Sequence, residues 1–199
     1  MLRLALARLR SRGRLTASGR PRLGRGVRFD LAPGAVLSLG DGCRVGDGCR
    51  FHLGSGATVS VGEDARLGER CVIAAHERVE IGAGAAVVIG AGAGLGERCV
   101  VAAHERVEIG PGARLGDEVV LIDFDHDVGD VERPVREQPL LTAPVVIGPR
   151  ALVGTAAGVL RGVTVGEGAR VGVRSVVTHD VPPGAHAEGT PARVQPAVR

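Results

Sequence analysis

The sequence predicts an all-β solenoid built from six-residue segments. From about residue 39 to residue 177, an aliphatic residue followed by glycine recurs at a basic step of six. A helix repeats its apolar residues every ~3.6 positions and a half-buried strand every ~2, so a step of six indicates short strands joined by sharp corners. The composition agrees, since 44% of the residues are hydrophobic although 32 are glycine, three are Phe and none is Trp or Tyr. The repeated aliphatic residues are Leu39, Val45, Val61, Leu67, Ile81, Ile89, Leu95, Ile109, Leu115, Ile147, Val153, Val165 and Val171.

The residues after each aliphatic position define the corner and the interior. We expect the repeat glycine to lie at a corner, where a missing Cβ permits backbone conformations closed to other residues. Four residues after the aliphatic residue comes a small one, which we expect to face a narrow core that only stacking on neighbouring coils can bury. All four cysteines are in this slot and no CxxC occurs, which favours core packing over disulfides. The small residues are Cys43, Cys49, Ala65, Cys71, Ala85, Cys99, Ala113, Ala169 and Ser175.

Length and charge limit the classes of function. A chain of 199 residues is long enough for one domain with short appendages. The net charge is +3, but residues 1–28 hold nine arginines and no acid, so the remainder carries −6. The chain has no lysine, which excludes P-loop and Schiff-base chemistry. The arginine run lacks interleaved aromatic residues, so nucleic-acid binding is not favoured.

We divide the chain into a basic N-terminal arm (1–28), a β-helix domain (29–181) and a C-terminal tail that packs on the prism (182–199). No run reaches the roughly 20 apolar residues of a membrane span. Two interpretations of the arm stay open: a basic segment resting on an anionic membrane surface, or a poorly ordered arm or short helix against the first coil. We expect a cytoplasmic protein, with peripheral membrane contact through the arm left open.

Two features interrupt the repeat. Residues 65–85 and 93–113 differ at only three positions, and each contains AAHERVE, which is two residues longer than a hexad. We therefore expect His76 and His104 on comparable corner bulges. The repeat then stops at residues 123–127 (DFDHD), and a polar, proline-bearing loop runs to residue 143. Solenoids place functional residues on such loops, so 123–143 is the candidate site.

The end of the chain carries a family resemblance. The segments APVVIG, VTVG, ARVG, SVVT, DVPP and GTPARV resemble those of the hexapeptide-repeat acyltransferases, in the sugar, maltose and galactoside O-acetyltransferase branch. The resemblance implies a left-handed parallel β-helix, although right-handed crossovers are the usual rule. It implies acetyl-CoA as donor and a homotrimer whose groove combines a loop of one copy with coils of another. It also places His126 on the family's catalytic histidine.

The chemistry explains the need for a histidine. A sugar hydroxyl is a poor nucleophile at neutral pH, and an imidazole can take its proton during attack on a thioester. One ring nitrogen must be held as a donor so that the other accepts. Asp125, Asp127 or a backbone carbonyl could hold His126, and the sequence does not choose among them. The oxyanion needs a donor, for which a backbone N–H at a coil corner suffices.

The resemblance also assigns binding positions. His104 aligns with a position that contacts the acceptor sugar. Two departures alter the donor site: His179 replaces a lysine, and Leu152 replaces a tryptophan. Matched position by position, the residues that contact the donor are Thr155, Val173, Thr178, His179 and Arg193.

Four functions compete. The first is an acetyl-CoA-dependent O-acetyltransferase acting on a sugar or polysaccharide precursor, including a lipid-linked one. The second is an N-acyltransferase acting on an amino sugar. The third, a γ-type carbonic anhydrase, needs an HxxxxH pair that the chain lacks, and no metal is expected. The fourth is a catalytically silent β-helix scaffold.

Overall fold

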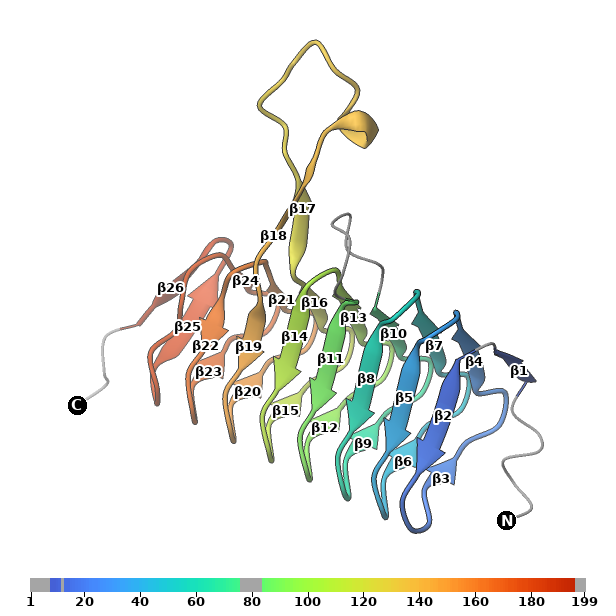
Figure 1. Ribbon diagram of the computed structural model, residues 1–199. Helices are drawn as coiled ribbons and strands as arrows, with labels where there is room; N and C mark the ends of the chain where they lie inside the picture. The colour runs from blue at the N-terminus through green and yellow to red at the C-terminus, as the bar shows by residue number, and fades with distance from the viewer. Residues whose placement is uncertain (1–7, 12, 76–83, 196–199) are drawn as a thin grey trace.

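The computed structural model describes residues 8–11, 13–75 and 84–195, and they form a three-sided parallel β-helix (Figure 1). Each coil of the chain adds one strand to each of three parallel sheets, here called A, B and C. The chain passes from sheet A to sheet B, then to sheet C, and on to sheet A of the next coil. Corners are named by the sheets that they join.

The strands are short, as the six-residue repeat predicts. Sheet A contains β1 (Arg8–Ser11), β4 (Arg28–Leu31), β7 (Arg50–Leu53), β10 (Val72–Ala75), β13 (Val100–Ala103), β16 (Val120–Ile122), β21 (Gly158–Val159) and β24 (Val176–Val177). Sheet B contains β2 (Arg14–Ala17), β5 (Val36–Leu39), β8 (Thr58–Val61), β11 (Ala86–Ile89), β14 (Arg106–Ile109), β19 (Val145–Ile147) and β22 (Thr164–Val165). Sheet C contains β3 (Arg22–Leu23), β6 (Arg44–Val45), β9 (Arg66–Leu67), β12 (Gly94–Leu95), β15 (Arg114–Leu115), β20 (Leu152–Val153), β23 (Arg170–Val171), β25 (His186–Gly189) and β26 (Ala192–Val194).

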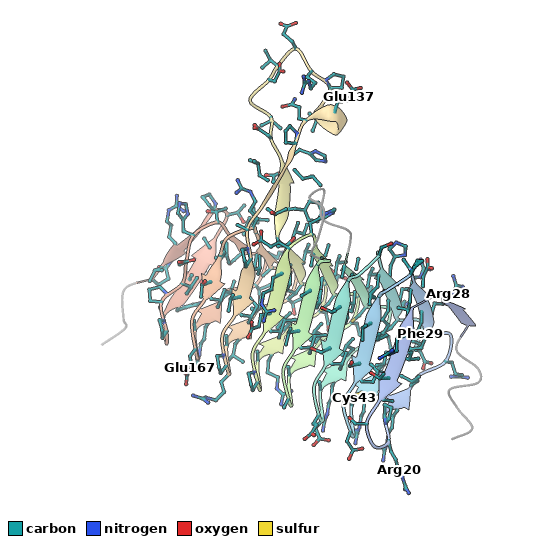
Figure 2. The ribbon with its side chains drawn as sticks, viewed as in Figure 1. Arg20, Arg28, Phe29, Cys43, Glu137 and Glu167 are labelled. Carbon is teal, nitrogen blue, oxygen red and sulfur yellow. The ribbon has the colours of Figure 1, made fainter. Side chains whose placement is uncertain are left out.

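One hairpin stands out from the prism at an A–B corner (Figure 1). It is made of β17 (Phe124–His126) and β18 (Leu140–Thr142), which pair antiparallel. A 3-10 helix, η2 (Val135–Glu137), lies toward its far end, where Figure 2 labels Glu137. This hairpin separates β16 from β19, which belong to the same coil.

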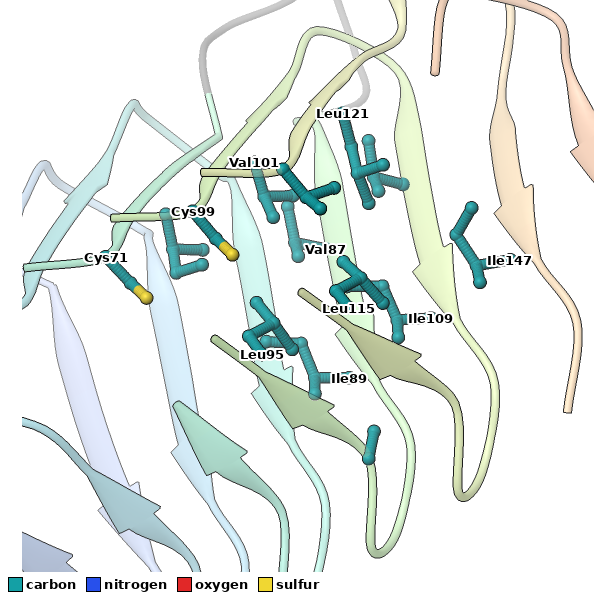
Figure 3. Close-up of a cluster of buried hydrophobic side chains, with 14 of the residues drawn as sticks. Cys71, Val87, Ile89, Leu95, Cys99, Val101, Ile109, Leu115, Leu121 and Ile147 are labelled. Atoms are coloured by element: carbon teal, nitrogen blue, oxygen red, sulfur yellow. The ribbon is translucent and has the colours of Figure 1, made fainter. Parts of the chain in front are cut away.

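The core is a set of columns in which each repeat residue covers its counterpart in the next coil. Figure 3 shows Ile89, Ile109 and Ile147 in one column and Leu95 beside Leu115 in another, and their strands pair in register. These side chains are at most 4% exposed. Full burial of one such side chain contributes roughly 1.5–3 kcal/mol. All four cysteines are free and buried, as the small-slot prediction requires.

The repeat glycines are needed for a reason that differs from the prediction. None of those in the described residues has a positive φ. A Cβ on Gly90 would instead lie 2.6 Å from the backbone N of Pro111 in the next coil. The left-handed conformation falls two residues later, at Gly92 (φ 64) or, in another coil, at Arg70 (φ 56). The repeat glycine is therefore required because successive coils approach too closely for a Cβ. Its backbone conformation does not require glycine.

Both ends of the chain extend the sheets. Strands β1 to β3 pair in register with β4 to β6, so coil formation begins inside the segment predicted as an N-terminal arm. At the other end β25 pairs with β23, and β26 turns back antiparallel onto β25. None of the helices in the described part of the chain has the length and apolar character needed to cross a membrane.

Candidate functional site

The neck of the hairpin is held by backbone pairing. The N–H of Ala143 donates to the carbonyl of Asp123 over 2.9 Å, which closes the hairpin where it joins the β-helix. His126 faces Leu140 across the hairpin, on paired strand backbone. The predicted catalytic histidine therefore lies on β17 at the base of the hairpin, close to the A–B corner, and not at the far end of the hairpin (Figure 1).

Asp123 ties this neck to the preceding coil. Its side chain is fully buried, and its carboxylate accepts the backbone N–H groups of His104, Glu105 and Arg106 at 2.7, 2.8 and 2.6 Å. Three donors to one carboxylate compensate its removal from water. Sequence reasoning missed this residue, although the alternation of inward positions at Val119 and Leu121 continues to 123. A charged residue at an inward position was the available signal.

His104 lies at the corner that Asp123 holds, and it contacts the hairpin. Its ring centroid is 4.4 Å from that of Phe124, with the ring planes at 69°. Phe124 and His126 are both half-buried, whereas Asp125 between them is exposed. Successive side chains of a strand point to opposite faces, so Phe124 and His126 share the face of β17 that meets His104. Its sequence duplicate, His76, lies outside the described residues.

The described residues do not select a partner that orients the imidazole of His126. Its Nδ1 is buried and has no hydrogen-bond partner among the described residues. Asp125 accepts the backbone N–H of His126 at 2.8 Å, and Asp127 accepts that of Gly129 at 2.9 Å. Both carboxylates therefore bind backbone amides in the single chain. A role for either in orienting the ring stays a prediction.

Four of the predicted donor residues lie along the two edges of sheet A beyond the hairpin, and Arg193 lies on β26 at the end of sheet C. Thr155 and Val173 are exposed at neighbouring C–A corners. At an A–B corner, the hydroxyl of Thr178 lies 2.9 Å from Nδ1 of His179. His179 and Arg193 line one pocket of about 310 Å³ at the C-terminal end of the prism. The single chain thus brings three of the five toward one end and keeps the other two on the opposite edge.

Large exposed apolar side chains gather around this region. Among the described residues, the exposed large apolar side chains lie either on the hairpin or in the coils and tail that follow it. They are Val128, Val131, Val135 and Leu141 on the hairpin, and Leu152, Leu160, Val173 and Val194 after it. Val131 is 90% exposed. Within the described ranges, no group of three or more His, Cys, Asp or Glu residues is arranged to hold a metal ion.

Sequence comparison finds partial relatives. No family model matches the chain. Over 80 residues, 40% of this chain, it is 38% identical to a probable acetyltransferase of Mycobacterium tuberculosis. Over 57 residues, 29% of this chain, it is 47% identical to the 2,3,4,5-tetrahydropyridine-2,6-dicarboxylate N-acetyltransferase of Staphylococcus aureus. The matches span 27% and 24% of the lengths of these two relatives.

Structural comparison covers nearly the whole chain. The polysialic-acid-specific acetyltransferase NeuO superposes with a TM-score of 0.72 and 22% identity over 92% of this chain and 83% of that one. The polysialic acid O-acetyltransferase OatWY gives 0.70 and 17% over 92% and 85%. A hexapeptide-repeat acetyltransferase of Vibrio cholerae, solved with acetyl-CoA, gives 0.50 and 21% over 76% and 71%.

The chain has the fold of the hexapeptide-repeat acetyltransferases. The predicted left-handed parallel β-helix is therefore confirmed. At these identities the likeness establishes the fold alone.

Proposed function

We propose that this chain is an acetyl-CoA-dependent O-acetyltransferase that acetylates a hydroxyl of a sugar or polysaccharide precursor, with His126 as general base. One observation carries the proposal: His126 lies on regular backbone at the neck of the hairpin, on the same face as Phe124, which contacts His104. Two histidines thus lie at one A–B corner, where the hairpin leaves the β-helix. The fold shared with known acetyltransferases supports this assignment.

The reaction needs one proton acceptor and one oxyanion donor. His126 takes the proton of the acceptor hydroxyl while the oxygen attacks the thioester carbonyl carbon. The tetrahedral intermediate then collapses, the C–S bond breaks, and the thiol of coenzyme A leaves with a proton. His104, whose backbone N–H donates to Asp123, would contact the acceptor sugar. Direct transfer of this kind requires no acyl-enzyme, and the buried cysteines are not needed.

The orientation of His126 supports a shared site. A buried ring nitrogen without a partner is costly, so Nδ1 calls for a group that the described part of one chain does not supply. We propose that a second copy or the bound substrate provides it, while Asp125 and Asp127 keep their contacts with backbone N–H groups. A base held in this way keeps the other nitrogen free to accept a proton.

The donor is proposed to bind along sheet A beyond the hairpin. Thr178, His179 and Arg193 would meet its phosphates at one end, because hydroxyl, imidazole and guanidinium groups all donate to phosphate. Thr155 and Val173 would line the other edge. The surface between these edges includes the exposed Leu160, which suits an uncharged acyl arm. Similar structures hold acetyl-CoA or coenzyme A, which agrees with this donor.

The assembly is proposed to be a homotrimer. The exposed apolar residues of the hairpin and those of the later coils form two separate groups on one chain. A head-to-tail contact between such groups closes into a ring when the rotation permits. The variant Val131→Asp tests this, because it should shift the sedimentation of the assembly toward the monomer. A monomeric wild-type protein with full activity would contradict the trimer.

A second acceptor class is favoured by one relative. The 47% identical segment belongs to an enzyme named as an N-acetyltransferase. Acetyl transfer to an amino sugar would use the same donor and the same base. The products differ, since hydroxylamine cleaves an acetyl ester and leaves an acetyl amide intact.

The direct test is release of coenzyme A thiol from acetyl-CoA in the presence of neutral sugars, amino sugars and polymeric or lipid-linked glycans. The proposal expects release that depends on one hydroxylated acceptor and a product sensitive to hydroxylamine. A hydroxylamine-resistant product would establish the N-acyl alternative. No release with any acceptor, from protein that is folded and assembled, would favour a silent scaffold. We place the reaction in the cytoplasm, where acetyl-CoA is made.

A further inference from the structure

Sheet C carries a column of arginines on its outer face. Arg22, Arg44 and Arg66 lie on successive strands in register, and Arg114 and Arg170 continue the column along the same sheet. All five side chains are exposed. We call these five residues the arginine track. The remaining positions of the column between β3 and β25 are held by Gly94, Leu152 and His186.

The charges of the track are not neutralised by the chain itself. Strands of one sheet lie about 4.8 Å apart, so like charges on adjacent strands repel. The arginines at the corners pair with acids, as Arg25 does with Asp47 and Arg98 with Glu118. Across the described ranges, no ion pair involves an arginine of the track. Three arginines on adjacent strands and two farther along the same column therefore offer guanidinium groups to an anionic ligand.

The shape of the face restricts that ligand to a narrow chain. Most strands of sheet C are two residues long and present a single outward side chain, so the track is one residue wide. Acidic residues stand on both bordering corners. Asp41, Glu63 and Asp64 lie on the B–C corners, and Asp47, Glu69, Glu97 and Asp117 on the C–A corners. A ligand that spreads beyond the track meets these carboxylates.

The C-terminal part of the track is hollowed. Arg114 and Arg170 line a groove of about 950 Å³ on sheet C, together with Leu152, Val173 and His186. In a three-sided prism, this face lies opposite the A–B corner that carries His126. The track therefore lies away from His126, although its groove shares Val173 with the proposed donor edge.

We propose that the arginine track binds a linear carboxylated polysaccharide. Guanidinium groups pair with carboxylates through two parallel hydrogen bonds, and a glycan with a carboxylate on each sugar can present one to each coil. A flat anionic bilayer would bring the acidic corners against its surface. A nucleic acid would find no aromatic side chain on this face to stack upon. The binding site stands whether or not the chain transfers acetyl groups.

The test uses oligogalacturonate of defined length, with its fully methyl-esterified form as a probe that has the same backbone without charge. Binding to the full chain is measured by calorimetry over a series of salt concentrations. The variant R44E/R66E reverses two adjacent charges of the track. The control R28E/R50E reverses two adjacent arginines on sheet A and changes the net charge equally.

The expected result is that wild-type protein binds the carboxylated chain and not its ester, with affinity that falls as salt rises. R44E/R66E should weaken binding by at least about tenfold and flatten the salt dependence, whereas R28E/R50E should keep most of it. Equal losses in the two variants would overturn the proposal in favour of a net-charge effect. Stronger binding of poly(uridylic acid), or of phosphatidylcholine vesicles containing phosphatidylglycerol, would also overturn it. So would a change of oligomeric state confined to R44E/R66E, because the face would then be a contact between copies.

Discussion

The carboxylate of Asp123 lies 2.7 Å from the backbone N of His104, so a residue at the neck of the hairpin fixes the corner of the preceding coil. The same carboxylate binds the next two backbone N–H groups as well. The two histidines of the proposed site are thus positioned by one buried anion, His104 through its backbone and His126 through the strand that follows Asp123.

The first prediction concerns Asp123→Asn. An amide in this place turns one acceptor into a donor that faces a backbone N–H. We expect a loss of about 1–3 kcal/mol in the free energy of unfolding and a fall in kcat as the corner shifts. Urea denaturation and steady-state acetyl transfer measure the two effects. Asp125→Asn is the matched control, since Asp125 is exposed and accepts a single backbone N–H. Equal effects in the two variants would contradict a special role for Asp123.

The second prediction separates two reasons for glycine in one corner. In Gly90→Ala, the new Cβ would lie 2.6 Å from the backbone N of Pro111, which cannot move without parting the coils. We expect a loss of about 3 kcal/mol in the free energy of unfolding. Gly92 has φ 64 and open space around a Cβ, so Gly92→Ala should cost only about 1 kcal/mol. Denaturant titrations compare the pair. A larger loss for Gly92→Ala would show that backbone conformation dominates.

The third prediction concerns alkaline pH. Burial, and to a lesser degree Asp41, raises the pKa of the Cys43 thiol to about 11, above the ~8.5 of an unfolded cysteine. At a pH between these two pKa values, the thiol therefore keeps its proton in the folded state and has lost it in the unfolded state. Its contribution is complete below about pH 8.5 and declines, at roughly 1.4 kcal/mol per pH unit, until about pH 11.

Cys43→Ala isolates this contribution. Alanine is the natural occupant of the same slot in the next two coils, at residues 65 and 93, so the fold should tolerate it. The decline of stability between pH 9 and 11, followed by urea denaturation, should be shallower in the variant than in the wild type. Parallel curves would place the alkaline loss elsewhere, for example at Cys71, whose pKa is raised to about 12 chiefly by its contact with Cys49.

Much of the fold could be predicted from the sequence, because the inward positions of a β-helix repeat. The columns that contain Ile89 and Leu95 follow directly from the six-residue step. The first coil was harder to predict, because arginines such as Arg14 and Arg22 fill its outward positions and give the segment the composition of a basic arm. The role of the repeat glycines depends on the distance between successive coils, which cannot be predicted from the sequence of one hexad.

The site could be predicted less completely. The break in the repeat locates the hairpin and its histidine, because a loop ejected from a solenoid is visible as lost periodicity. Asp123 was not predicted as a site residue, because a charged residue is not expected at a position that faces the core. Thr155 and Thr178 lie on opposite edges of sheet A. We propose that a second copy completes the donor site, which would explain their separation in one chain.

The central claim is that the imidazole of His126 takes the proton of the acceptor, and the variant His126→Ala tests it most directly. Acetyl transfer, measured as thiol release with the acceptor identified from the glycan panel, should fall by about 10²- to 10⁴-fold in kcat. Thermal stability and oligomeric state should stay unchanged. The control His52→Ala removes a partly exposed histidine that pairs with Asp30, far from the hairpin. This variant should transfer acetyl groups at the wild-type rate. Full activity of a folded His126→Ala protein would contradict the account.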